Sequence, residues 1–567
     1  MCIRDTTIRT LDPDNPVVDS IAIKNGRILA VGESALRLQE SALETVDLGT
    51  NVIVPGFIEP HTHPDLCAQM YSWVDISGFT YHSAEDVMHA LRECVHRFEP
   101  GDWIFVFGYD PVLYDDLLGL SLAELDEISP YNPIAVMTQS MHTLYVNSLA
   151  LDTAGITNES EPPRFGGEYV KNALGELTGK IEEAPAMRPF LRFFDDSLQV
   201  RSLNLSRQYE RYRSAGITMI GSAGLFFRDS DTADLYRNLA SDSNCKIRNA
   251  VYLRHMDLAN NVLEPFLANG RFGFNGVKLW YDGSPYTGTM LLDSPYLETK
   301  LTTSGLAIPS GSTGRSNWDI DDFGALVNEL HEAGIQILVH AQGDRATREV
   351  LDAFEQTLSR SNRREHRHRI EHCALIEPGE VERAARLGVS ISFHMNHVKY
   401  YGDRLRDDII GSDRINQLML AASAISHGIR ISLHADSPMF PANPLDLMQT
   451  AVTRESITGI KINESEKIGR EEALRAVTSD AAWQLGFDHE VGTIEVGKLA
   501  DLTKTEEDPI MRLNPTLYKV VQQAQADPKD FADPFQKIME QQHQWIDKGD
   551  GEFINDLIYR SDLDHPL

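Results

Sequence analysis

Short apolar runs rich in β-branched residues recur along this chain. Runs of this length, bounded by glycine, proline or polar residues, are typical of buried β-strands. The first run, Val54-Pro55-Gly56-Phe57-Ile58, is followed by His61 and His63. Because strand side chains alternate between two faces, both imidazoles should project to the same side. Ten such runs predict strands at 53–59, 104–109, 134–139, 217–222, 248–254, 275–281, 335–340, 369–373, 389–394 and 430–435.

From residue 217 onward, the predicted strands alternate with helix-like stretches. This alternation is the signature of repeated βα units around a parallel sheet. With the strand at 53–59 these strands make eight, so we predict an α/β fold built on a (βα)₈ TIM-like barrel over residues 53–484. The two remaining strands, at 104–109 and 134–139, belong to an expected insertion after strand one, residues 68–205, over the C-terminal mouth of the barrel.

Both ends of the barrel region are flanked by short β-like stretches. Alternating residues around Asn25-Gly26, a strong hairpin signal, predict a small β unit over residues 1–52. The turn-bounded stretch 492–501 is its expected partner. We therefore predict a small β-sandwich built from residues 1–52 and 485–505, followed by an acidic C-terminal extension at 506–567.

Composition narrows the class of protein. The chain has 567 residues, of which 42% are hydrophobic, so it can bury a large core. Its 84 acidic and 52 basic residues give a net charge of -32, which argues against a nucleic-acid partner. Five irregularly spaced cysteines indicate no disulfide framework, and we find neither a signal sequence nor a membrane span. We expect a soluble, cytoplasmic protein.

Candidate chemistry lies where the predicted barrel strands end. A (βα)₈ barrel places its reactive residues at the C-terminal ends of its strands. In this chain, those ends carry residue types that ligate metals. Lys278 is the exception, because it interrupts an apolar strand in which an unpaired ammonium would be costly to bury. The candidate metal ligands, in chain order, are His61, His63, Lys278, His340, His372 and Asp436.

Four neutral imidazoles and one carboxylate can bind zinc or a similar divalent ion, with positions left for water and substrate. Lys278 is either an unmodified lysine paired with a carboxylate or a carbamate whose two oxygens bridge two metals. Asp436 could take a proton from a metal-activated water and pass it to the leaving group, or serve as a helix N-cap before Ser437-Pro438. We expect one or two divalent ions, zinc being the first candidate.

The ordered motifs resemble the amidohydrolase superfamily, and specifically its amidohydrolase-3, or YtcJ-like, metal-dependent hydrolases. The resemblance covers about residues 15–505 and is carried by the segments 54–63, 276–284, 339–344, 369–372 and 434–438. It implies a distorted barrel with a β-sandwich from both chain ends. It also implies His61 and His63 on one metal, a carboxylated Lys278 as bridge, His340 and His372 on the other metal, and Asp436 as the metal-contacting acid and base. The polar run 503–507 departs from the apolar closing strand of the family.

Four further residues are candidates for substrate binding. His142 resembles a family position in the insertion that reaches the substrate, although a structural histidine is an equal alternative. Tyr286 lies in a loop, 283–289, that could line the cleft or form a turn. His394 and His397 follow strand seven, where they would face either the pocket or solvent. His366 and His368 precede strand six at the opposite face of the barrel, so we expect them at the surface.

These features favour a metal-dependent hydrolase of an amide-type C–N bond in a small molecule, which could be an N-acyl or N-formyl amide. Opening of a cyclic amide or amidine, or a one-metal isomerisation, is the alternative on the same scaffold. A non-catalytic ligand-binding protein is a third hypothesis, but such proteins are expected to lose metal ligands, and none is missing here. We expect neither a nucleic-acid nor a membrane partner, and a homodimer is one assembly to consider.

Overall fold

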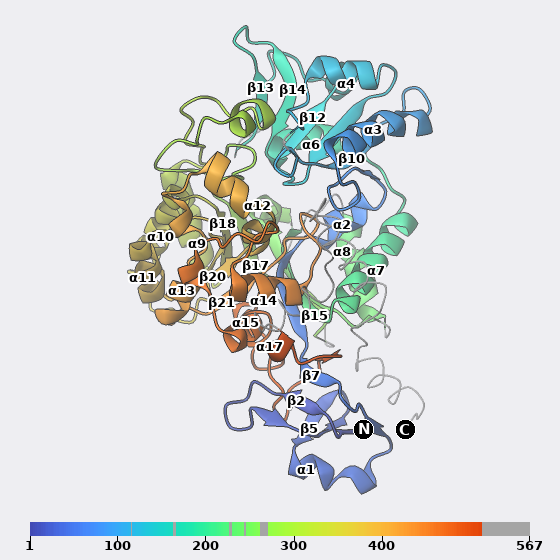
Figure 1. The fold of residues 1–567 in the computed structure, drawn as a ribbon, viewed down its shortest axis with the longest axis vertical. Coiled ribbons are helices and arrows are strands. Elements are labelled where there is room, and N and C mark those ends of the chain that lie inside the picture. The colour runs from blue at the N-terminus through green and yellow to red at the C-terminus, as the bar shows by residue number, and fades with distance from the viewer. Residues whose placement is uncertain (115, 163–165, 226–229, 243–244, 261–269, 513–567) are drawn as a thin grey trace.

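The computed structural model describes residues 1–114, 116–162, 166–225, 230–242, 245–260 and 270–512. Figure 1 shows two small sheets at the bottom, the barrel in the middle and the insertion at the top. Most of the expected acidic extension, 506–567, lies outside the described residues. None of the described helices combines the length and the apolar character that crossing a bilayer requires.

Eight parallel strands form the central sheet in chain order, which confirms the predicted barrel. The barrel is nearly closed: the amide of His63 donates to the carbonyl of Ser437 (2.9 Å) where the first and last strands meet. The order of the strands around the barrel is β8 (Phe57–Thr62), β15 (Ile217–Leu225), β16 (Arg248–Arg254), β17 (Phe272–Trp280), β18 (Gln336–Ala341), β19 (Arg369–His372), β20 (Ser390–Phe393) and β21 (Ile431–Leu433).

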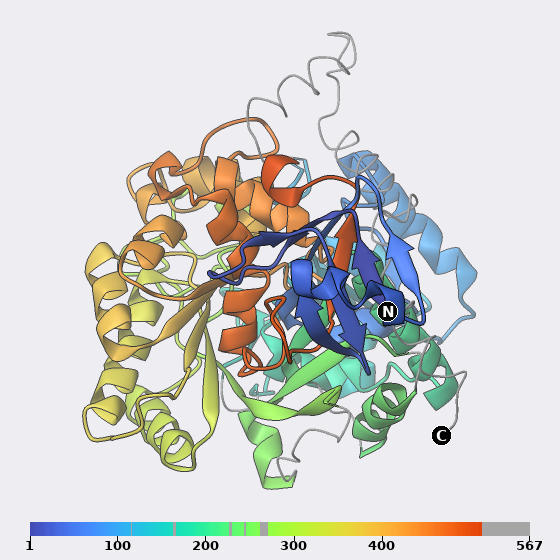
Figure 2. The same cartoon turned by 90° about the horizontal axis from the view of Figure 1, so that it is seen from below.

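Helices pack around the outside of the barrel (Figures 1 and 2). The helix α10 (Asp344–Leu358) shows why: Val350, Phe354 and Leu358 recur at a spacing of four residues and are buried together on one face. The other helices that follow the barrel strands are α7 (Leu198–Ser214), α8 (Ser230–Ser241), α9 (Ile320–Glu332), α11 (Pro378–Leu387), α12 (Asn396–Arg404), α13 (Ala421–Ser426), α14 (Pro444–Thr453) and α15 (Arg470–Ala476). The helix α16 (Ser479–Gln484) instead packs against Met219, Tyr252 and Leu338 on the inner face of the strands.

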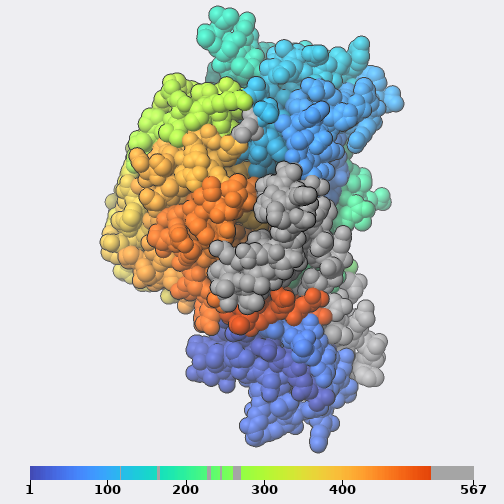
Figure 3. Space-filling view, viewed as in Figure 1, coloured from blue at the N-terminus to red at the C-terminus, as the bar shows by residue number. Residues whose placement is uncertain are grey.

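A six-stranded mixed sheet lies between β8 and β15 in the chain, within the segment for which we expect an insertion. Its strand order is β13 (Glu168–Lys171), β14 (Leu177–Glu182), β12 (Thr143–Val146), β11 (Ile134–Thr138), β10 (Ile104–Tyr109) and β9 (Val74–Asp75). The helices of this part are α2 (Pro64–Met70), α3 (Ala84–Cys94), α4 (Leu122–Ile128), α5 (Ser148–Ala154) and α6 (Ala184–Leu191). The insertion lies at one end of the barrel in the ribbon and space-filling views (Figures 1 and 3).

The chain ends build two four-stranded sheets. One has the order β5 (Arg27–Val31), β4 (Ile21–Lys24), β1 (Cys2–Arg4) and β6 (Thr45–Asp47). The other has the order β22 (Leu502–Thr505), β7 (Val52–Pro55), β2 (Thr7–Arg9) and β3 (Val17–Val18). A shared core joins residues of both sheets, among them Ile3, Ile53 and Leu502. The exact domain boundaries stay a prediction.

The C-terminal strand of these sheets differs from our expectation. We expected it at 492–501, with a polar run in place of the closing strand of the family, but the strand is Leu502–Thr505. The segment 492–501 does meet the N-terminal β unit, through an isolated bridge of Leu499 with Arg27 and backbone hydrogen bonds to Gly26 and Ile28. All four residues of β22 pair with β7 in an antiparallel register. Threonine is β-branched and therefore suits a strand. The pairing of β22 with β7 forms a strand here even though the segment has few apolar residues.

The predicted strand at 53–59 is two strands that belong to different sheets. β7 ends at Pro55 and β8 begins at Phe57, with Gly56 between them. A Cβ atom at Gly56 would lie 2.1 Å from Thr218 Oγ1 on β15, so only glycine fits where the chain passes from the small sheet into the barrel. This passage leads directly to His61.

The expectation that His366 and His368 lie at the surface is wrong. Both side chains are buried, and they form a histidine cluster with His331 of α9 at the start of β18 and β19. His331 Nδ1 lies 2.9 Å from His368 Nε2, and the Ile337 amide donates to His368 Nδ1 (3.1 Å). Their position before strand six, at the opposite face of the barrel, suggested the surface, but hydrogen bonds to backbone groups of Ile337 and Leu387 hold these rings in the core.

Candidate metal centre

The ends of β8, β17 and the segment after β21 bring four expected ligands to one point. His63 Nε2 lies 3.1 Å and His61 Nε2 lies 3.5 Å from the same carboxylate oxygen of Asp436. Lys278 Nζ lies 3.1 Å from His61 Nε2. His61 and Lys278 are fully buried, while the side chain of Asp436 is 11% exposed. A single ion among these atoms could therefore contact all of them and still be reached from one side.

A buried ion pair holds the ring of His61. Its Nδ1 lies 2.5 Å from Glu371 Oε2, and Glu371 is paired with Arg369 at 2.5 Å. The carboxylate requires a hydrogen on Nδ1, because an ionised carboxylate can only accept. The lone pair of His61 is then on Nε2, which faces Lys278 and Asp436. A carboxylate that accepts from the other ring nitrogen of a metal-binding histidine commonly orients that ring.

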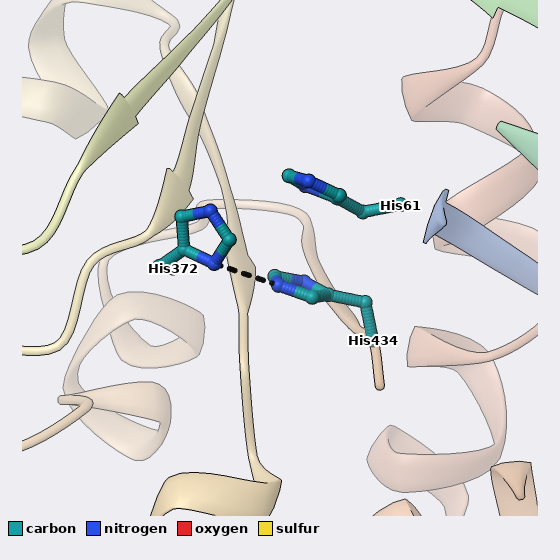
Figure 4. Close-up of side chains that lie close together, drawn as sticks. All are labelled: His61, His372 and His434. Atoms are coloured by element: carbon teal, nitrogen blue, oxygen red, sulfur yellow. Dashed lines mark hydrogen bonds between the residues drawn. The ribbon is translucent and has the colours of Figure 1, made fainter. Parts of the chain in front are cut away.

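The ring of His372 is supported by a second histidine, His434, which we did not propose as a site residue. Figure 4 shows His372 and His434 joined by a hydrogen bond beside the ring of His61, and the two nitrogens, Nδ1 and Nε2, are 3.2 Å apart. The other nitrogen of His434, Nδ1, lies 2.8 Å from Ser392 Oγ. Both nitrogens of His434 are therefore engaged with protein groups, which makes it a support for His372.

Gln484 anchors the far end of this chain of polar contacts. The amide nitrogen of Gln484 donates to the carbonyls of Ile391 and Arg430 (both 2.9 Å), so its oxygen faces Ser432, 2.5 Å away. The hydroxyl of Ser432 is also oriented as a donor to Ser392 Oγ, 2.9 Å away, so Ser392 accepts from Ser432.

Metal binding by His372 through Nε2 would require one set of tautomers. In that set, His372 Nδ1 donates to His434 Nε2, and His434 Nδ1 donates to Ser392 Oγ, whose second lone pair can accept it. His372 Nε2 is a buried nitrogen without a hydrogen-bond partner among the described residues. An orphaned buried nitrogen at this position fits a metal ligand.

His340 lies beside His372, with ring centroids 4.3 Å apart. Its Nε2 lies 3.1 Å from the carbonyl of Gly283, which can only accept, so the lone pair is on Nδ1. Asp282 stands 3.8 Å from the same Nε2 and accepts the backbone amides of Leu291, Gln342 and Gly343. Burial raises the pKa of Asp282 to about 7.

The electrostatics keep the imidazoles neutral, as metal binding requires. Burial, followed by the charge of Lys278, lowers the pKa of His61 well below its usual value. Burial also lowers the pKa of His372 and of His340. Burial lowers the pKa of Lys278 to about 8. For Asp436, burial raises the pKa, but the hydrogen bond and charge of His63 outweigh it and leave the pKa below its ordinary value.

The donor set fits a divalent ion. Among the described residues, three groups of side chains have ligand atoms within 4.8 Å of one another: His61, His63 and Asp436; His61, His372 and His434; and His372, His394 and Asp436. Imidazole nitrogen and carboxylate oxygen are ligands that zinc accepts. His61, His63 and Asp436, with Lys278, would hold one ion, and His340 and His372 would hold a second beside it.

The residues expected near the substrate are all buried or nearly so. His394 lies 5.7 Å from His372 between ring centroids and directs Nε2 at the carbonyl of Ala435 (3.0 Å). His397 Nδ1 lies 3.0 Å from the hydroxyl of Tyr286. Neither His394 nor His397 faces solvent, which removes that alternative. His142 lies in the insertion, with its Nδ1 2.7 Å from Glu183 Oε2.

Sequence reasoning missed the supporting residues of the site. Glu371 and His434 lie inside motifs that we used, next to His372 and Asp436, but their spacing does not show which ring each one contacts. Glu183 and Asp282 carried a weaker signal, because a single acid in a loop is usually solvated. Only the fold places these side chains against the histidines.

A family model described as "Amidohydrolase family" matches residues 44–524. The chain belongs to the amidohydrolase family. It is 28% identical over 524 residues to the protein LONG AFTER FAR-RED 3 of Arabidopsis thaliana, covering 88% of this chain and 86% of that protein. It is 26% identical over 531 residues to the N-substituted formamide deformylase of Arthrobacter pascens, covering 90% and 94%. YtcJ of Bacillus subtilis (strain 168) is 26% identical over 521 residues, covering 88% and 93%.

A solved structure has the same fold as this amidohydrolase. It is an uncharacterized metal-dependent hydrolase from Pyrococcus horikoshii OT3, with a TM-score of 0.69 and 22% identity, covering 90% of this chain and 98% of that chain. The family match and the YtcJ-like relatives identify the present protein as a hydrolase.

Proposed function

We propose that this amidohydrolase cleaves the C–N bond of a small amide with water, using one or two divalent ions, of which zinc is the first candidate. The observation that carries the proposal is the convergence of His61, His63, Lys278 and Asp436 within 3.5 Å contacts, on the ends of different barrel strands. The adjoining rings of His340 and His372 each have one nitrogen held by a buried partner, the carbonyl of Gly283 and the ring of His434. Convergence of this kind supports a metal centre more strongly than any one residue does.

Asp436 is the proposed catalytic acid and base. When bound, divalent ions supply a water that ionises near neutral pH and polarise the carbonyl of the substrate. Asp436 would take the proton of the attacking water and give it to the leaving nitrogen, so that the amide yields an acid and an amine. Its low pKa keeps it ionised at neutral pH.

We propose that Lys278, as a carbamate, could hold two ions through its two oxygens. The neutral amine of lysine attacks carbon dioxide, forms an N–C bond and loses one proton, which gives an anion with two oxygens. A pKa of about 8 leaves a useful fraction of neutral amine at physiological pH. The alternative, an unmodified Lys278, would pair with Asp436 or Glu371.

The proposed substrates are N-acyl or N-formyl amides. The Arthrobacter pascens relative is named for N-substituted formamides, which supports that class as the first to test. The insertion residue His142 and the inner-wall residues Tyr286, His394 and His397 are proposed to contact the substrate. Cyclic amide or amidine opening, one-metal isomerisation, a homodimer and a cytoplasmic location stay predictions. The family match disfavours the non-catalytic alternative.

The test is to load the purified protein with Zn²⁺, Mn²⁺ or Ni²⁺ and assay it on a panel of N-substituted formamides and N-acetyl amines. Mass spectrometry would identify the products. We expect hydrolysis that a chelator abolishes, that added metal restores, and that Asp436→Ala removes. Unchanged turnover in the metal-loaded Asp436→Ala protein would contradict the proposal, as would isomerised rather than hydrolysed products.

A further inference from the structure

The insertion meets the barrel next to the metal centre through His142 and Glu183. His142 directly precedes β12, and Glu183 directly follows β14. These strands pair in an antiparallel register that sets Thr143 opposite Glu182. The amide of Glu183 donates to the carbonyl of His142 (3.0 Å), and His142 Nδ1 lies 2.7 Å from Glu183 Oε2. Two hydrogen bonds therefore lock the pair together.

The carboxylate of Glu183 is also held from the barrel side. The hydroxyl of Thr289, in the loop after β17, donates to Glu183 Oε1 (2.7 Å). A Cβ atom on Gly283 would lie 2.2 Å from the same oxygen, so the loop approaches Glu183 as closely as glycine permits. Glu183 itself has a φ of 66°, a costly backbone conformation for a residue other than glycine. Contacts from two parts of the fold thus fix this carboxylate.

His142 lies over the metal centre. Its ring centroid is 5.4 Å from that of His340, and its side chain remains 18% exposed while that of Glu183 is 5% exposed. Because Nδ1 is engaged with Glu183, Nε2 is the nitrogen that can reach a bound molecule. Gly283 contacts both His340 and Glu183. Its carbonyl accepts from His340, and the absence of a side chain leaves room for the carboxylate of Glu183.

We propose that Glu183 is a positioning residue that holds His142 against the amide group of the substrate, so that the insertion completes the active site of the barrel. This inference rests on the proposed function and deepens it. It predicts that Glu183 acts on turnover only through His142. A purely structural glutamate would instead contribute independently of that histidine.

The experiment is a double-mutant cycle with the variants Glu183→Ala, His142→Ala and the pair combined. Each is metal-loaded and assayed for kcat and KM on the best N-substituted formamide or N-acetyl amine of the panel. We expect each single variant to lose about 10- to 100-fold in kcat/KM, the range for removing a support of a site residue. The double variant should match His142→Ala within about threefold, and Glu183→Gln should restore part of the loss.

Glu182→Gln is the matched control. Glu182 adjoins Glu183 but pairs with Arg315 (2.7 Å) and Lys180 (2.8 Å), away from His142. This variant should keep its kcat/KM, and all variants should keep their metal content. Losses that multiply in the double variant would overturn the inference, as would an equal loss in Glu182→Gln.

A second measurement does not require turnover. Hydrogen exchange at the C2 carbon of each imidazole, followed by mass spectrometry, should change at His142 in Glu183→Ala and stay constant at His331 and His397. If the wild-type protein hydrolyses nothing on the panel, the proposed function fails, and this measurement alone decides about Glu183. An exchange rate at His142 that is the same in Glu183→Ala and in the wild-type protein would overturn the inference.

Discussion

Replacement of His434 by alanine should weaken metal binding without removing any metal ligand. In the wild-type protein, His434 Nε2 lies 3.2 Å from His372 Nδ1 and His434 Nδ1 lies 2.8 Å from Ser392 Oγ, and all three residues are buried. The variant leaves the ring of His372 free to turn, so that its Nε2 lone pair no longer faces the centre in a single orientation. Because a ligand that is not held in one orientation binds less tightly, we expect a lower metal affinity.

The magnitude follows from the two groups that lose a partner. Each buried polar group left without a hydrogen bond costs about 1–3 kcal/mol in the free energy of unfolding. Loss of a residue that supports a metal ligand typically lowers metal affinity about 10- to 100-fold, or about 1.4–2.8 kcal/mol. Ser392→Ala, which leaves the His372–His434 contact in place, should have a smaller effect on affinity.

The assay is competition for Zn²⁺ against a chelator of known affinity, with the unfolding midpoint of the metal-free protein measured in parallel. We expect weaker binding at an unchanged number of ions per chain. Wild-type affinity in a folded His434→Ala protein would refute the reasoning. The loss of one whole ion per chain would show instead that His434 is itself a ligand.

Three further predictions concern other parts of the structure. Asp436→Asn should lower kcat by about 10²- to 10⁴-fold, the range for losing an acid and base, with the protein still folded by circular dichroism. Burial lowers the pKa of His331, His366 and His368 below that of an unfolded chain, which binds protons near pH 6.5. Their contribution to stability is therefore complete above about pH 6.5 and declines as the pH falls below it. The unfolding midpoint should fall more steeply between pH 6.5 and 5 in the wild-type protein than in His368→Gln, and parallel curves would count against this assignment. Gly283→Ala should destabilise the protein by about 1–3 kcal/mol, because its Cβ would meet Glu183 and Thr289. Denaturant unfolding would measure the loss, and a stability equal to wild type would contradict the close contact.

The barrel was predictable because most of its strands contain an apolar, β-branched run and are buried along nearly their whole length. The metal-ligating residue types stood out for the same reason, since Lys278 interrupts one such run and His340 follows another. The boundaries of the strands were harder to predict. Gly56 divides one apolar run into strands of two sheets, and only its contact with Thr218 shows why.

The supports of the site could not be predicted from the chain alone. Gln484 contacts the chain of polar groups that reaches His372 through Ser432, Ser392 and His434, yet more than a hundred residues separate Gln484 from His372. Nothing in the spacing of serines and glutamines indicates such a chain of contacts. The same holds for His366 and His368, whose burial depends on backbone groups of neighbouring strands.

The passage from β7 through Gly56 into β8 makes the terminal sheets and the ligands His61 and His63 parts of one continuous segment. β22, near the other end of the described chain, pairs with β7 along its whole length. Removing either terminus to obtain a minimal barrel would therefore take away the contacts that hold the start of β8 in place. A truncated protein should lose its ions before its helices unfold.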